Sequence, residues 1–262
     1  MKPILIILAL LLPAYVFAGF DEGMQAYQHA DFAAARALWQ PLAEQGNRDA
    51  QFGMGLLYEA DKGKQADPTQ AVQWYQKAAT QGQSRAQNNL ADAYRIGLGV
   101  QQDFSQAAHW YQQAADQGNA QAQARLGVLY YNGQGLKQDM QQARNWLQKA
   151  ADQHQVLAQL YLGMMAYNGE GGARDYVAAE KWLRLSASQG NAAAENFMAH
   201  LYETGHGVPQ DNYQALRWRL SAAHHGNKDA RKQLPAIYQQ QKTCVNSMDA
   251  APYRCAPESP IP

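Results

Sequence analysis

The chain has 262 residues, and its 22 Lys and Arg residues balance its 22 Asp and Glu residues. Loss of a leader containing Lys2 would leave 21 basic residues against 22 acidic ones. A protein with this balance has no broad positive field to gather nucleic acid or anionic lipid. We therefore expect neither nucleic acid nor a membrane surface as a partner.

The first residues have the pattern of a secretory signal peptide. Met1 and Lys2 precede the apolar run ILIILALLLPAYVF, which is too short for a spanning helix, and Val16 and Ala18 stand at suitable positions for cleavage. We predict a signal peptide over residues 1–18, cleaved near Ala18, and a mature chain that is periplasmic or secreted without membrane insertion. An uncleaved N-terminal anchor is the alternative.

The two cysteines fall together near the C-terminus. Cys244 and Cys255 are separated by ten residues in sequence, in a chain that we expect to be exported to an oxidising compartment. We predict one disulfide between them. A metal or redox site would need further ligands or a C-x-x-C spacing, and the sequence has neither.

An internal repeat of 36 residues determines the expected fold. Equivalent alanines, which we call origins, recur at this interval, and a tryptophan lies 24 residues after each of the first five origins. The origins are Ala50, Ala86, Ala122, Ala158, Ala194 and Ala230, and the tryptophans are Trp74, Trp110, Trp146, Trp182 and Trp218.

Each repeat contains the pattern of two helices. The first, helix A, has apolar residues at helical spacing, as in AQARLGVLYYNG, and ends at paired glycines such as Gly133 and Gly135. An acidic residue such as Asp103 follows, where it can cap the second helix, helix B. Helix B carries small residues that allow close packing, and we expect the tryptophan to fill the gap between helices.

The pattern A-x-x-x-L-G-x-x-Y-x-x-G-x-G, then D, then A-x-x-W-Y-x-x-A-A-x-x-G resembles the Sel-1-like repeat family, a relative of the tetratricopeptide repeats. This resemblance implies an all-α fold, a right-handed superhelical solenoid of antiparallel helix pairs. We expect an N-terminal capping pair at 19–49, five repeats at 50–229, a C-terminal capping helix at 230–243, and a disulfide loop and tail at 244–262.

The resemblance also implies a protein partner bound on the concave helix-A surface. By analogy with tetratricopeptide repeats, the inward positions lie one residue before each origin and two, six and nine after it. They would form an apolar centre with polar margins, typical of protein-binding sites. The alternative is that Leu157, Leu160 and Val128 pack between neighbouring repeats. The candidates are Tyr131, Tyr167, Met164, Leu160, Val128, Arg95, Asn88, Asp92, His200, Glu203 and Asn196.

No catalytic or metal site is expected. The seven histidines show no zinc-like spacing, and the sequence has no G-x-S-x-G elbow or phosphate-binding loop. We predict no cofactor, no metal and no enzymatic activity. The resemblance implies an adaptor or regulator of an envelope complex, or alternatively an immunity protein that neutralises a periplasm-acting effector such as a phospholipase. A β-lactam-binding or hydrolysing enzyme is a third, weaker hypothesis.

Overall fold

The computed structural model describes residues 12–60 and 66–234, which contain twelve complete α-helices and no β-strand. The all-α class predicted from the repeat is therefore confirmed over the described residues. Three predicted features lie wholly or partly outside them: the signal peptide up to residue 11, most of the C-terminal capping helix, and the Cys244–Cys255 pair with its tail. Within the described residues, no helix is both long and apolar enough to cross a membrane.

The helices divide into two compact units, each described here by itself. Unit 1 (Met1–Asp139) contains α1 (Leu12–Gln28), α2 (Phe32–Glu44), α3 (Arg48–Ala60), α4 (Pro68–Thr80), α5 (Ser84–Ile96), α6 (Phe104–Asp116) and α7 (Ala120–Asn132). Unit 2 (Met140–Pro262) contains α8 (Met140–Ala151), α9 (Val156–Asn168), α10 (Tyr176–Ala187), α11 (Ala192–Thr204) and α12 (Asn212–His224), followed by helical residues 228–234.

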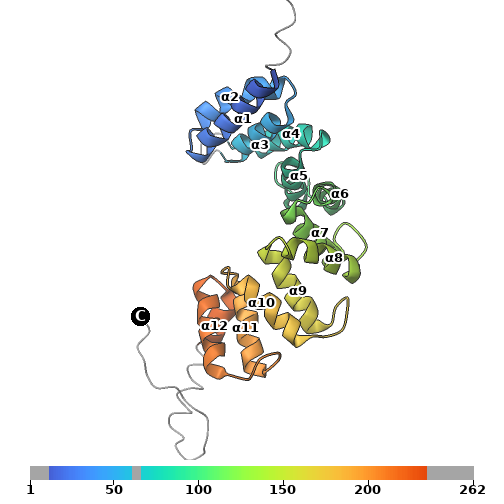
Figure 1. Cartoon of the computed structure of the whole chain (residues 1–262), viewed down its shortest axis with the longest axis vertical. Helices are drawn as coiled ribbons and strands as arrows, with labels where there is room; N and C mark the ends of the chain where they lie inside the picture. Colours follow the sequence, from blue (N-terminus) through green and yellow to red (C-terminus); the bar gives the residue numbers. More distant parts are fainter. Residues whose placement is uncertain (1–11, 61–65, 235–262) are drawn as a thin grey trace, which may run out of the picture. The chain divides into compact units, whose positions relative to one another are not determined.

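Within each unit, every helix packs against the next one along the chain (Figure 1). The connecting loops are short, so neighbouring helices run antiparallel. Helix A of the repeats corresponds to α3, α5, α7, α9 and α11, and helix B corresponds to α4, α6, α8, α10 and α12. This is the helix-pair packing that the repeat predicts.

In each helix B, the residue after the tryptophan is more buried than the tryptophan itself. Tyr111 and Leu183 are 0% exposed, whereas Trp110 and Trp182 are only half-buried, and Trp146 is 9% exposed. The residue after the tryptophan therefore fills the gap between helices that we expected the tryptophan to fill. Close packing also requires the small residues, because a Cβ on Gly163 would lie 2.5 Å from Cγ of Leu183.

The predicted caps are present at helix ends. The side chain of Asp103 accepts hydrogen bonds from the backbone N–H groups of Ser105 and Gln106 at the start of α6. At the other end of a helix A, Gly133 caps α7 in the left-handed conformation, with φ +67°. These caps satisfy backbone groups that the helices cannot pair internally.

A buried glutamine after the origin joins successive helix pairs, a feature that the sequence analysis missed. Gln87 on α5 donates from Nε2 to the carbonyl oxygen of Ala79, at 3.1 Å, in the last turn of α4. Its Oε1 accepts from Nε2 of Gln117, 2.7 Å away, just after α6. Gln51 makes the equivalent bonds to Ala43 and Gln81. Each of these two glutamines therefore links three consecutive helices.

The fifth repeat keeps the contact with the following helix through different residues. Glu195 replaces the glutamine and is 2% exposed. It accepts from the Ser221 hydroxyl at 2.7 Å and lies 2.8 Å from Nδ1 of His225, which occupies the position of Gln117. His225 therefore has a partner in the repeat interface, although its side chain is 43% exposed.

The turn after helix B needs a left-handed residue, and one repeat lacks the usual glycine. Gly118 has φ +85° at this position, whereas His154 adopts φ +63°. An L-residue with a Cβ is strained by roughly 1–2 kcal/mol there. A backbone hydrogen bond from the N–H of His154 to the carbonyl oxygen of Ala151, 2.9 Å long, maintains the turn.

Replacing His154 with glycine should raise the free energy of unfolding by about 1 kcal/mol, because glycine accepts positive φ without strain. Gly118→Ala is the matched reverse change, since no atom lies within 4 Å of its new Cβ. It should lower stability by a similar amount. Urea denaturation followed by circular dichroism measures both. Shifts of the same sign would contradict this explanation.

Candidate functional site

The predicted partner-binding residues fall on helix A of four repeats and are divided between the two units. Unit 1 holds Asn88, Asp92, Arg95, Val128 and Tyr131 on α5 and α7. Unit 2 holds Leu160, Met164, Tyr167, Asn196, His200 and Glu203 on α9 and α11.

In unit 1, Asp92 is the centre of a hydrogen-bonded network. Its carboxylate accepts from the Tyr111 hydroxyl at 2.7 Å and from Nη2 of Arg95 at 2.9 Å. Nδ2 of Asn88 lies 3.4 Å from the second carboxylate oxygen, and Asn88 is only 4% exposed. Asn88 therefore does not present the exposed polar margin that we expected of it.

Burial strongly raises the pKa of the Tyr111 hydroxyl, and the negative charge of Asp92 raises it further. The Tyr75 hydroxyl in the preceding repeat also has a raised pKa, first because of burial and then because of Glu59, to which it donates a hydrogen bond. Both phenols thus stay protonated in the folded chain at pH values where an exposed tyrosine ionises.

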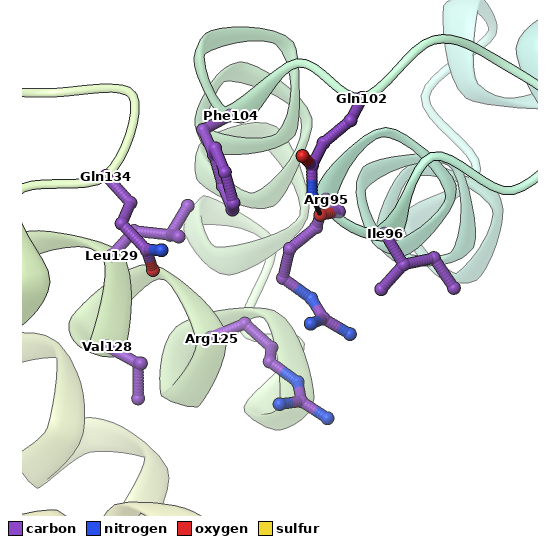
Figure 2. Close-up of a pocket in the computed structure, with 8 residues that line it drawn as sticks. All are labelled: Arg95, Ile96, Gln102, Phe104, Arg125, Val128, Leu129 and Gln134. Atoms are coloured by element: carbon purple, nitrogen blue, oxygen red, sulfur yellow. Dashed lines mark hydrogen bonds between the residues drawn. The ribbon is translucent and has the colours of Figure 1, made fainter.

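A pocket of about 390 Å³ opens beside this network. Arg95 from α5 and Arg125 from α7 extend toward the same region, with Phe104 and Leu129 across from them (Figure 2). Val128 also lines it. Val128 and Tyr131 are both half-buried. Of the predicted site residues, the pocket thus brings together Arg95 and Val128.

In unit 2, the predicted apolar residues differ in exposure. Leu160 is 8% exposed and belongs to the core cluster around Leu183. Met164 and Tyr167 are half-buried and pack against that cluster. Leu160 therefore packs in the core of the repeats, which was the alternative to exposure on the helix-A surface. Met164 and Tyr167 keep part of their surface accessible to solvent.

Tyr167 lies at the centre of an aromatic and imidazole cluster. Its hydroxyl is 2.9 Å from Nε2 of His200 and 3.1 Å from Nδ1 of His206. Its ring is 5.0 Å from that of Phe197 and 5.1 Å from that of Tyr176. We call these five residues the Tyr167 cluster. Of them, only Tyr167 and His200 are among the candidates predicted from the sequence.

The remaining predicted residues of unit 2 surround a buried arginine. Arg219 is 4% exposed and occupies the position that Tyr111 and Leu183 have in other repeats. It donates to the Glu203 carboxylate from Nη2, and its Nη1 lies 3.4 Å from Oδ1 of Asn196. Glu203 and Asn196 thus neutralise and orient a buried cation.

The described residues contain no group of three or more His, Cys, Asp or Glu residues that could hold a metal ion. Ser221, Glu195 and His225 contact one another, but both Ser221 and His225 bond to the carboxylate. A nucleophile and its base would instead bond to each other.

Comparison with known proteins identifies the family. The Sel1 repeat model matches residues 48–83, 84–119, 120–154, 156–191 and 192–227. The chain belongs to the Sel1 repeat family, whose members generally act as protein-interaction scaffolds. A search of curated proteins found no match.

Solved structures show the same fold. A Sel1 repeat protein from Oxalobacter formigenes matches with 30% identity and a TM-score of 0.79, over 89% of this chain and 91% of that one. A protective antigen from uropathogenic Escherichia coli strains matches with 34% identity and a TM-score of 0.75. That match covers 86% of this chain and 49% of the antigen, so this chain spans about half of its length.

The ion pair between the buried Arg219 and the partly exposed Glu203 predicts a clear pattern of stability. Glu203→Ala should lower the free energy of unfolding by about 2 kcal/mol, because it leaves the Arg219 guanidinium buried without its carboxylate. The double variant Glu203→Tyr with Arg219→Leu copies the Tyr167 and Leu183 pair, and should lie within about 1 kcal/mol of wild type. Thermal and urea unfolding test both. A double variant less stable than Glu203→Ala would contradict this account.

Alkaline pH should destabilise the fold through the buried tyrosines. Because the pKa values of Tyr75 and Tyr111 are raised in the folded chain, the folded chain keeps two protons that the unfolded chain releases above pH 10. The free energy of unfolding is therefore unaffected by ionisation of these tyrosines below pH 10 and falls as the pH rises further. The loss should approach 1.4 kcal/mol per pH unit for each tyrosine. Tyr111→Phe should flatten the decline between pH 10 and 11.5, whereas Tyr213→Phe, at a residue 54% exposed, should leave it unchanged.

Proposed function

We propose that the chain is a non-enzymatic scaffold that binds a protein partner through the helix-A surface, as an adaptor or regulator of an envelope complex. The observation that carries this proposal is the Tyr167 cluster. Its five rings come from three helices and a loop, and four of them are half-buried while His200 is exposed. Partly accessible aromatic side chains of this kind supply most of the energy in many protein interfaces.

The internal contacts of the surface also favour binding. Tyr167 is held by two imidazoles and by packing on the core, so its ring has little rotamer freedom to lose in a complex. Asp92 and Arg95 in unit 1 are likewise fixed by each other and by Tyr111. These side chains are therefore pre-organised in the unbound protein.

The N-terminal pattern supports a proposed location. Residues 1–18 have the charge and apolar run of a signal peptide, and the Cys244 and Cys255 pair suits an oxidising compartment. We therefore place the proposed partner in the periplasm or outside the cell. Recovery of a chain cleaved near Ala18 in the osmotic-shock fraction tests this placement.

Site-specific photo-crosslinking tests the surface. A crosslinker at His200, in the Tyr167 cluster, should capture a discrete partner from periplasmic extract. A crosslinker at Tyr213, which is 54% exposed on α12 and outside the cluster, is the control and should not. A pull-down with scaffold that carries no crosslinker tests the same surface. The double variant Tyr167→Leu with His200→Ala should recover at least fivefold less partner than wild type, and its helical circular dichroism signal should be unchanged.

Equal crosslinking from both positions, or equal capture by the variant, would contradict the proposal. The stoichiometry separates two roles of the same surface. Weak binding to several envelope proteins supports an adaptor. Tight one-to-one binding to a toxic effector would support an immunity protein.

A further inference from the structure

The unit 1 pocket has a chemical character of its own. Two arginines, Arg95 and Arg125, line it, and none of the described residues in its lining carries a carboxylate. Phe104, Val128 and Leu129 supply an apolar wall. Figure 2 shows the guanidinium groups on one side of the pocket and Phe104 and Leu129 on the other.

The nearby carboxylate does not balance both cations. Asp92 lies 2.9 Å from Nη2 of Arg95 and 4.0 Å from Nε of Arg125, an ion-pair distance too long for a hydrogen bond, so one carboxylate faces two guanidinium groups. The Arg125 side chain is 41% exposed. The contacts of Arg95 with Asp92 and Tyr111 involve Nε and Nη2, whereas a guanidinium carries five N–H donors. The site thus keeps net positive charge and donor capacity for an anion.

An apolar surface continues beyond the pocket. Ile96, which lines it, is 51% exposed, and Leu98 in the following turn is 43% exposed. A chain that passes across the pocket would cover these residues on its way. A ligand that ended in the pocket would leave them in water, so their exposure favours an internal segment of a partner over a chain terminus.

We propose that the unit 1 pocket receives an Asp or Glu side chain from an internal segment of the protein partner, with a neighbouring aliphatic residue packed against Phe104, Val128 and Leu129. This inference rests on the proposed function and specifies the partner chemistry in unit 1. Arg125 is the principal ligand of the carboxylate, and Arg95 adds a second guanidinium. Planar guanidinium donors match a carboxylate in charge and geometry.

A blocked peptide provides the direct test. The probe is a fluorescent peptide with the core Leu-Glu-Leu, acetylated at its N-terminus and amidated at its C-terminus. The Glu side chain is then the only carboxylate in the segment that binds. The control replaces Glu with Gln. Fluorescence anisotropy with the full chain should show at least tenfold tighter binding of the Glu peptide, and added salt should weaken it.

Variants of the protein then assign the site. Arg125→Ala should reduce affinity for the Glu peptide at least tenfold, to the level of the Gln peptide, and Arg125→Lys should restore part of it. Arg217→Ala removes the same charge from an exposed position on α12 and should change nothing. Arg125 is preferred to Arg95 as the tested residue, because loss of Arg95 would also disturb Asp92 and Tyr111.

Three outcomes would overturn the inference: equal affinity for the Glu and Gln peptides, equal losses in Arg125→Ala and Arg217→Ala, or equally tight binding of a Gln peptide with a free C-terminal carboxylate. The last would indicate a chain terminus as the ligand. These failures are distinct from failure of the proposed function, which is tested at the Tyr167 cluster in unit 2. If crosslinking at His200 succeeds while the peptides fail, only the pocket inference falls.

Discussion

The buried glutamine after the origin allows helix pairs to pack on one another. Helix B ends with carbonyl groups that have no partner in their own helix, and the next helix A covers them. Gln87 donates to one of these carbonyls, that of Ala79, which also accepts from the N–H of Gly82 in the turn, and it accepts from Gln117 in the following turn. Loss of Gln87 would remove two hydrogen bonds between helices, each worth about 1 kcal/mol.

The alanine, glycine and glutamine positions maintain the packing of the helix pairs. Contacting residues at other positions can therefore be substituted together from one repeat to the next. Tyr111 pairs with Asp92 and Arg95, and Arg219 pairs with Glu203. In the fourth repeat the same position is Leu183, which packs with Met164 and Tyr167. The polar or apolar character of the helix-A surface therefore depends on the core residue of helix B, because a buried polar group needs a polar partner while a leucine does not.

The repeated features could be predicted from the sequence, whereas contacts unique to one repeat could not. The period places the helices from α3 to α12, and the left-handed glycine at the end of α7 follows from its recurrence. By contrast, His206 reaches Tyr167 from a loop 39 residues away, and its neighbours in sequence give no sign of this contact. The burial of Asn88 was also missed, because spacing gives the face of a helix but not the depth of a side chain.

The fifth repeat shows which property of the glutamine link is essential. Glu195 cannot donate the bond that Gln87 makes, yet it remains buried because Ser221 and His225 both supply contacts to its carboxylate. The repeat thus tolerates a change of chemistry when the neighbouring residues complete the hydrogen bonds locally. The same tolerance explains how similar helix pairs present two guanidinium groups in unit 1 and an aromatic cluster in unit 2. Local departures from the repeat pattern thus change the side-chain chemistry of the surface while the helix-pair arrangement within each unit is kept.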